Sequence, residues 1–238
     1  MKTFLILIFV ISSFENEIKK GILMDSSYSI INKINWNFVF LNDIKFIMLI
    51  INKLNNNFPY SDLRKYLYYD YDSKFLEYYS AASRFKITEL QKGAVWVNYA
   101  ENLEQVEKGV EDCVKKIGGI KFEYPIFYLI NSYLFNKGKE IVNQAAKTFC
   151  DILKKNQLYC GIYAFTNEFE NYFDDEIKNN YPIWAIDLPI PEIPYQGNWG
   201  IREYTQNGRL QGLEKSARLS ESRVDYYNII KEGHYNGY

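Results

Sequence analysis

Three carboxylates occur where predicted strands end, and with them the chain could carry out acid–base chemistry. Asp187 and Glu203 lie at the ends of two successive predicted strands. Asp25 comes just after the first predicted strand of the chain. Two carboxylates about 5 to 9.5 Å apart can cleave a glycosidic bond, one as the acid and the other as the nucleophile or base. The alternative is that all three are solvated loop residues, and the sequence leaves both interpretations open.

Composition excludes several other kinds of site. His234 is the single histidine and lies near the C-terminus, so a Ser-His-Asp site, a Cys-His site and a multi-histidine metal site are not expected. No glycine-rich phosphate-binding loop occurs. We therefore expect no metal and no cofactor. The formal net charge of −1 also argues against nucleic acid as a partner, because nothing basic dominates to neutralise phosphates.

The three cysteines match no metal or redox spacing. Cys150 and Cys160 could form one disulfide in an oxidising compartment, which would leave Cys113 free. Three buried free thiols are an equal alternative.

Aromatic side chains make up 18% of the chain, and flat rings of this kind can stack on sugar faces. A compositional bias toward Tyr explains the richness equally well. Five aromatic residues at predicted strand positions are candidates for substrate binding, with a place in the core as the alternative: Trp96, Tyr99, Tyr163, Trp184 and Tyr204.

The predicted elements that position these residues follow one pattern in the first three quarters of the chain and another in the last quarter. Up to residue 181, predicted strands at 44–51, 94–99, 124–130 and 159–165 alternate with predicted helices at 70–85, 102–117, 139–153 and 168–178. Beyond it, strands at 181–186, 200–204 and 213–219 are separated only by turns, and a last helix follows at 221–231. Together with a first strand that ends before Asp25, this order predicts a single α/β, TIM-like barrel of eight strands, with helices missing between the last three. Residues 52–64 are predicted to be a long loop or insertion.

The first 14 residues are predicted to be a signal peptide. Lys2 supplies a positive charge, an apolar run follows at 4–11, and Ser12 and Ser13 come next. The run is shorter than the roughly 20 apolar residues that cross a bilayer, and a buried first strand is the alternative. We expect a secreted monomer with no membrane partner, whose single domain spans residues 15–238.

Several segments resemble, in order and spacing, the family-25 glycoside hydrolases, which are muramidase-type lysozymes. Among them are Gly21-Ile22 in the first strand, Tyr124-Pro125-Ile126 before the fourth, and Asn236-Gly237-Tyr238 at the end. The remaining similar segments are 92–100, 161–163, 181–185 and 200–204. The resemblance implies a barrel that lacks its last helices. It also implies an ancestral cleavage of the β-1,4 bond after N-acetylmuramic acid in peptidoglycan, by acids at the C-terminal ends of strands.

The chain departs from the family pattern at these acids. Leu23 stands where the first strand of the family has Asp, and Arg218 where the eighth has Asp. Leu129 and Asn131 stand where the fourth has Asp-x-Glu. Asn131 cannot protonate a leaving group, and loss of a general acid typically costs ~10² to 10⁴ in rate. Leu129 removes a negative charge, and Arg218 adds a positive one where a cationic transition state needs the opposite.

The sequence therefore predicts a secreted, lysozyme-like protein that recognises peptidoglycan or a related cell-wall glycan and is catalytically degenerate. One alternative is an active glycosidase that uses relocated carboxylates at Asp25, Asp187 and Glu203. Another is a structural secreted protein without a ligand.

Overall fold

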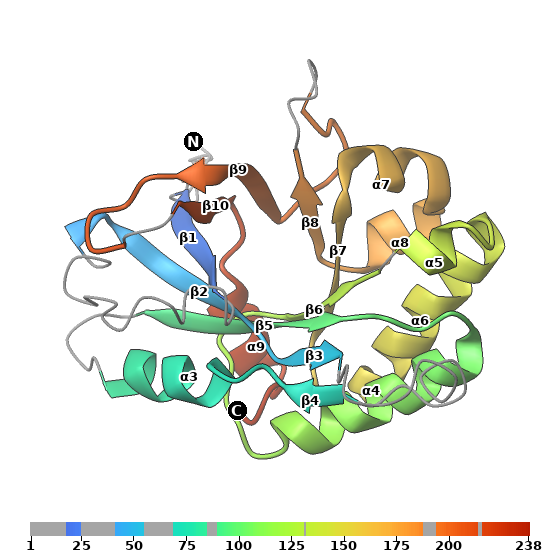
Figure 1. Ribbon diagram of the computed structural model, residues 1–238, viewed down its shortest axis with the longest axis horizontal. Helices are drawn as coiled ribbons and strands as arrows, with labels where there is room; N and C mark the ends of the chain where they lie inside the picture. The colour runs from blue at the N-terminus through green and yellow to red at the C-terminus, as the bar shows by residue number, and fades with distance from the viewer. Residues whose placement is uncertain are drawn as a thin grey trace, which may run out of the picture.

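Eight strands close a barrel in the order β1-β10-β9-β8-β7-β6-β5-β2 (Figure 1). The computed structural model describes residues 18–24, 41–54, 69–84, 90–130, 132–187, 194–213 and 216–238. The barrel strands are β1 (Lys19–Met24), β2 (Ile44–Ile50), β5 (Gln91–Val97), β6 (Ile126–Leu129), β7 (Cys160–Phe165), β8 (Ile183–Ile186), β9 (Ile201–Gly208) and β10 (Ala217–Ser222). The predicted α/β barrel of eight strands is confirmed.

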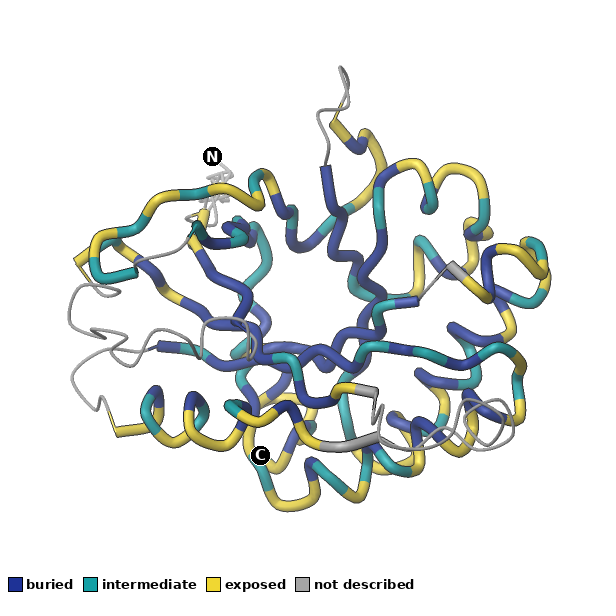
Figure 2. The backbone as a smooth tube through the Cα atoms, in the orientation of Figure 1, coloured by how far each residue is buried: buried dark blue, intermediate teal, exposed yellow. Residues whose placement is uncertain are grey.

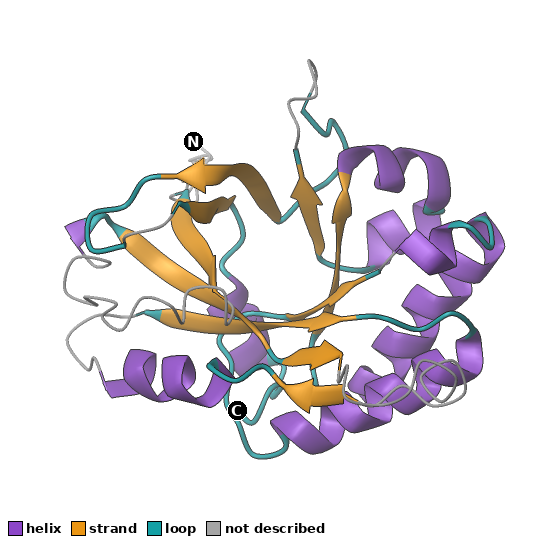
Figure 3. Ribbon diagram, viewed as in Figure 1, coloured by secondary structure: helices purple, strands orange, loops and turns teal. Residues whose placement is uncertain are grey.

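Helices cover one side of the barrel. They are α3 (Phe75–Arg84), α4 (Leu103–Ile117), α5 (Ser132–Phe135), α6 (Lys139–Lys155), α7 (Thr166–Tyr172), α8 (Asp175–Asn180) and α9 (Tyr226–Glu232). Figure 3 shows them gathered outside β2 and β5 to β8, with α9 below the barrel. Within the described residues no helix joins β8 to β9 or β9 to β10, as the sequence predicts.

The apolar spacing of the sequence explains these helices. In α4, Val106, Val110, Cys113 and Ile117 recur at helical intervals and are buried. Asn102 begins the helix, since its side chain accepts a hydrogen bond from the Gln105 amide. The buried face of α4 packs beside α6 against the barrel wall.

The last strand reverses direction. β10 is antiparallel to both β9 and β1, whereas the other neighbouring strands are parallel. Only residues 209–216 join β9 to β10, and a connection this short suits antiparallel strands, because a parallel return needs a dozen or more residues. As a result, the beginning of β10 lies at the same end of the barrel as the ends of the other seven strands.

Two hydrophobic clusters lie on the two faces of the barrel wall. The outer cluster lies between the strands and helices α3 to α8 and includes Trp96, Tyr128 and Phe149. The inner cluster fills the barrel and includes Phe46 and Phe127. Successive strand residues point to opposite faces, so the wall is buried on both sides, as the dark ring in Figure 2 shows.

Helix α9 and the C-terminal tail close the N-terminal end of the barrel. Tyr226 and Ile230 of α9 belong to the inner cluster. The side chain of Asn236 accepts a hydrogen bond from the Tyr159 amide at 2.8 Å and donates to the Tyr124 carbonyl at 3.0 Å. The tail is thereby tied to the segments that lead into β6 and β7.

β10 and α9 begin at Ala217 and Tyr226, later than the predicted 213 and 221, and two further local features differ in kind from the prediction. The single helix predicted at 168–178 is divided into α7 and α8, and the side chain of Asn143 binds both edges of the break, at the Tyr172 carbonyl and the Asp174 amide. The predicted loop at 52–64 begins with strand β3 (Asn52–Leu54). It pairs with β4 (Tyr69–Tyr71), where helix had been predicted from residue 70. Both strands are only three residues long, too short for their pattern to reveal.

The cysteine question left open by the sequence has a clear outcome. Cys150 of α6 and Cys160 of β7 form a disulfide, and Cys113 of α4 is free and buried.

Candidate functional site

The candidate site lies at the C-terminal end of the barrel, where seven parallel strands end and β10 begins. TIM-like barrels carry their active sites at this end. The alternation along each strand decides which residues face inward: Leu23, Leu129, Tyr163 and Trp184 all belong to or pack against the inner cluster.

Two of the four positions that the sequence resemblance assigns to family acids are apolar residues inside the barrel. Leu23 is 1% exposed and pairs in register with Arg218 of β10. Leu129 is half-buried and lies in register with Tyr163 of β7. Asn131 and Asp25 lie outside the described residues. Neither Leu23 nor Leu129 can donate a proton or stabilise a positive charge.

Glu203 of β9 is the carboxylate that the fold brings into the barrel interior, and three side chains donate to it. The Tyr163 hydroxyl donates to Glu203 Oε2 at 2.5 Å, and Arg218 Nε donates to Glu203 Oε1 at 3.0 Å. Gln206 Nε2 donates to the same Oε1 at 3.3 Å. Arg218 also donates to the Tyr163 hydroxyl oxygen, which closes a three-membered network.

Charge and hydrogen bonding together hold the Glu203 side chain in one position. Glu203 is fully buried, so its negative charge needs a partner, and the Arg218 guanidinium supplies one. Burial, together with the charge of Glu203, raises the pKa of Tyr163 well above its usual value. Tyr163 therefore keeps its proton and remains a donor. Both carboxyl oxygens of Glu203 are thus held by side chains of the barrel itself.

Asp187 lies on the other face of the wall. It follows the inward-facing Ile186, and its Oδ1 accepts from the Thr166 hydroxyl at 2.6 Å and from the Tyr195 amide at 3.2 Å. Its Oδ2 lies 3.6 Å from Arg202 Nε, and Arg202 also pairs with Glu221. Asp187 and Glu203 are thus neighbours in the sheet whose carboxylates belong to separate networks.

The five aromatic candidates are not gathered into one groove. Tyr163 and Trp184 stack inside the barrel, with ring centroids 4.0 Å apart, and both are fully buried. Trp96 belongs to the outer cluster and Tyr99 packs against it. Tyr204 is 39% exposed on the outward face of β9. The structure brings together two of the five.

Sequence reasoning missed the partners of the two carboxylates. From the sequence, Arg218 was interpreted only as a positive charge that disfavours catalysis. In the structure it is the counter-ion of Glu203. The pairing of Arg202 with Asp187 could have been anticipated in part. Arg202 and Glu203 are adjacent in β9, so their side chains must face opposite sides of the sheet. Nothing in the sequence indicated that Thr166 would reach Asp187.

The described part of the chain offers no group of three His, Cys, Asp or Glu side chains that could hold a metal ion. Among the same residues, no helix is long and apolar enough to cross a membrane.

Comparison with solved structures identifies the fold. A modular autolysin from Streptococcus pneumoniae, solved with a synthetic peptidoglycan ligand, has a TM-score of 0.68 at 15% identity. A family 25 glycosyl hydrolase from Bacillus anthracis has a TM-score of 0.65 at 19% identity, over 92% of this chain and 93% of its own. This chain has the family-25 glycosyl hydrolase fold. A bacterial lysozyme from Streptomyces coelicolor shares the family-25 fold with a TM-score of 0.64 at 13% identity, over 89% of this chain and 95% of its own.

The match to the autolysin covers 86% of this chain and 46% of the autolysin, so the chain spans about half of that protein's length. No family model matches the sequence. No curated protein matches it either. The family-25 resemblance of the sequence is thus supported at the level of the fold.

Proposed function

We propose that this protein recognises peptidoglycan or a related cell-wall glycan through its family-25 fold and does not hydrolyse it. The observation that carries the proposal is the network around Glu203. The buried carboxylate is bound by Arg218, Tyr163 and Gln206, so it cannot act as the acid of a glycosidase. A general acid must hold a transferable proton within reach of the leaving oxygen.

The surrounding residues support the same conclusion. The two leucines at family acid positions remove charge from the inner face. The Arg218 guanidinium adds a positive charge there, against the oxocarbenium-like transition state of glycoside hydrolysis. Asp187 has its own partners on the outer face, so it does not form a catalytic pair with Glu203 across a bound sugar.

Glycan recognition is supported by what similar folds bind. The autolysin that this chain resembles was solved with a synthetic peptidoglycan ligand. Export, directed by residues 1–14, is part of the proposal, because a protein must leave the cell to meet cell-wall glycan; these residues lie outside the described part of the chain.

The test combines hydrolysis and binding on one preparation. We expect purified protein to release no labelled fragments from peptidoglycan above background, with an active lysozyme as the positive control. The same protein should sediment with insoluble peptidoglycan. Changing Leu129→Asp and Asn131→Glu together should restore little hydrolysis, because Arg218 stays beside the new carboxylate and holds its pKa down.

A blocking variant tests whether the C-terminal end of the barrel binds the glycan. Leu129→Lys places a long charged side chain at that opening and should abolish sedimentation. Leu76→Lys is the matched control, since Leu76 is exposed on α3, outside the barrel, and it should leave sedimentation unchanged.

Two outcomes would overturn the proposal. Robust wild-type hydrolysis that is lost on Glu203→Gln or Asp187→Asn would establish an active glycosidase with relocated carboxylates. Absence of both hydrolysis and sedimentation would establish a structural protein without a glycan ligand.

A further inference from the structure

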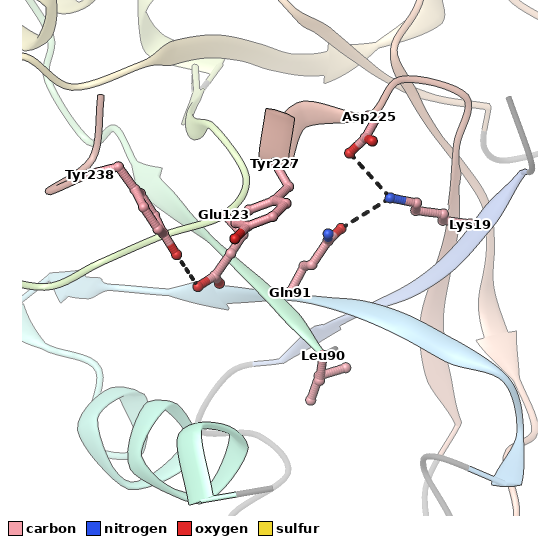
Figure 4. A pocket seen from close by; sticks show the side chains of 7 residues that line it. All are labelled: Lys19, Leu90, Gln91, Glu123, Asp225, Tyr227 and Tyr238. Carbon is pink, nitrogen blue, oxygen red and sulfur yellow. Dashed lines mark hydrogen bonds and ion pairs between the residues drawn. The ribbon is translucent and has the colours of Figure 1, made fainter. Parts of the chain in front are cut away.

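A cavity lies at the opposite end of the barrel from Glu203. Its volume is about 360 Å³, at the lower end of the ~300–1,000 Å³ typical of small-molecule sites. The cavity is lined by Lys19, Leu90, Gln91, Glu123, Asp225, Tyr227 and Tyr238. All seven are buried or half-buried. They come from the beginnings of β1 and β5, the segment before β6, the first turn of α9 and the C-terminal tail (Figure 4).

The polar groups form two sets across the cavity (Figure 4). On one side, Lys19 Nζ lies 3.3 Å from Asp225 Oδ1 and 3.4 Å from Gln91 Oε1. On the other side, the Tyr238 hydroxyl donates to Glu123 at 2.6 Å. The Lys19 contacts are longer than the ~2.7–2.9 Å usual for a charge-assisted hydrogen bond. A ligand that exchanges hydrogen bonds with Lys19 and Gln91 therefore displaces only weak internal contacts.

The charges around the cavity cancel. Lys19 pairs with Asp225, and Glu123 pairs with Lys92 at 3.1 Å. Lys92 does not line the cavity, so an anionic ligand would meet two carboxylates and a cationic ligand would meet the Lys19 ammonium. A neutral ligand meets no uncompensated charge and finds both donors and acceptors.

Two aromatic rings complete the wall. Tyr227 and Tyr238 meet edge to face with centroids 5.9 Å apart, and Leu90 adds an apolar side chain. Hydroxyl groups both donate and accept hydrogen bonds, and the C–H faces of a sugar ring are apolar. Carboxylates, an amide, an ammonium group and aromatic rings around one cavity match both properties.

We propose that this cavity binds a single neutral sugar unit, as a site separate from the one at the C-terminal end of the barrel. Lys19 and Gln91 bind hydroxyl groups on one side, Asp225 and Glu123 accept from others, and Tyr227 packs against the ring. The protein would then bind a single free sugar at this end of its barrel, apart from the polymeric glycan bound at the other end.

The test is a titration of the full-length protein followed by NMR at the Gln91 side-chain amide. The probes are glucose and N-acetylglucosamine, with glucosamine and glucuronate as charged analogues. We expect saturable shifts with the neutral sugars at about millimolar concentration. Gln91→Ala, followed at the Lys19 signal, and Tyr227→Ala, followed at the Lys19 and Gln91 signals, should each weaken binding about tenfold, the loss of roughly one net contact.

Two controls make the result specific. Tyr133→Ala removes a 50% exposed tyrosine from α5 and should leave the affinity unchanged. Leu129→Lys should abolish peptidoglycan sedimentation without altering these titrations, which separates this proposal from the one above. Thermal unfolding of each variant verifies folding, and Tyr227→Phe, which keeps the ring, should retain binding.

The proposal is overturned by absence of saturable binding with either neutral sugar, or by binding that both cavity variants leave intact. Tighter binding of glucosamine or glucuronate than of glucose would also overturn it, because the cavity would then select a charged ligand.

Discussion

Glu203 is stabilised inside the barrel by two neighbouring side chains and not by contact with solvent. A fully buried carboxylate is costly unless it is paired and hydrogen-bonded, and Arg218 and Tyr163 do both. Arg218, whose positive charge would oppose lysozyme catalysis, therefore stabilises the buried Glu203. Arg218 and Glu203 therefore form one structural unit, in which each charge compensates the other.

The substitution Arg218→Ala tests this arrangement. It leaves Glu203 buried without its counter-ion, so we expect the free energy of unfolding to fall by about 3–5 kcal/mol, measured by urea denaturation at neutral pH. Adding Glu203→Gln should recover part of the loss, because the buried charge is then gone. Arg209→Ala is the control, since Arg209 is exposed beyond the end of β9. A loss below about 1 kcal/mol, the level of a surface ion pair, would contradict the arrangement.

Asn236 illustrates a second residue whose role is purely positional. It is fully buried at φ 52°, a left-handed conformation that Asn tolerates better than most residues. Asn236→Gly keeps that conformation but removes the hydrogen bonds to Tyr159 and Tyr124. We expect a loss of about 2–4 kcal/mol in unfolding free energy, because a buried N–H and a buried carbonyl lose their partners.

His234 provides the matched control for this prediction. It also has a positive φ, 54°, but its side chain is exposed. His234→Gly should be neutral or slightly stabilising in the same denaturation experiment. Equal effects of the two substitutions would show that conformation, not hydrogen bonding, determines the stability at Asn236.

At the scale of elements, the disulfide joins helix α6 to the strand that follows it. Cys150 and Cys160 are 10 residues apart, so the loop they close is short. A cross-link of this length is expected to contribute about 2–3 kcal/mol by restricting the unfolded chain. Reduction with dithiothreitol should lower the unfolding free energy by that amount in urea. Cys113→Ala should show the same response to reduction, and an unaltered wild-type midpoint after complete reduction would contradict the expectation.

The free thiol on α4 should not interfere with that measurement. Cys113 is buried, and burial raises its pKa well above the usual value, so it stays protonated and unreactive in the folded protein. A thiol reagent should therefore modify the native protein only as it unfolds.

At the scale of the whole molecule, the barrel is filled with aromatic side chains that titrate. Burial raises the pKa of Tyr124, Tyr163 and Tyr226 above the ordinary value near 10. The folded state keeps these hydroxyls protonated, whereas the unfolded chain loses their protons above about pH 10. Their contribution to stability is complete below that pH and is lost as the pH rises above it, by up to about 1.4 kcal/mol per pH unit for each tyrosine.

Urea denaturation between pH 8 and 11, with tyrosinate absorbance recorded in parallel, measures this effect. The unfolding midpoint should stay level up to about pH 10 and then fall steeply. Tyr124→Phe should make the fall less steep, since one buried hydroxyl is absent. A midpoint that rises with pH, or native protein in which all tyrosines ionise near pH 10, would contradict it.

Most of the fold could be predicted from the sequence. Apolar spacing in 102–117 and 139–153 specifies helices α4 and α6, and the short apolar runs between turns specify the strands, because each pattern records which face is buried. The loss of helices after residue 181 was visible as short, turn-rich connections. The short strands β3 and β4 and the break between α7 and α8 were not, since they depend on pairing and on Asn143, a residue distant in sequence.

The sequence by itself supplied the resemblance and, through it, the prediction of which residues stand at the positions of the family acids, because that resemblance rests on local segments such as Tyr124-Pro125-Ile126. Only the tertiary structure decided what the remaining carboxylates do. Glu203 and Asp187 are equally plausible on paper, yet one points into the barrel toward Arg218 and the other outward toward Thr166. The reason is physical: what a carboxylate can reach depends on partners that folding brings together from 15 to 40 residues away.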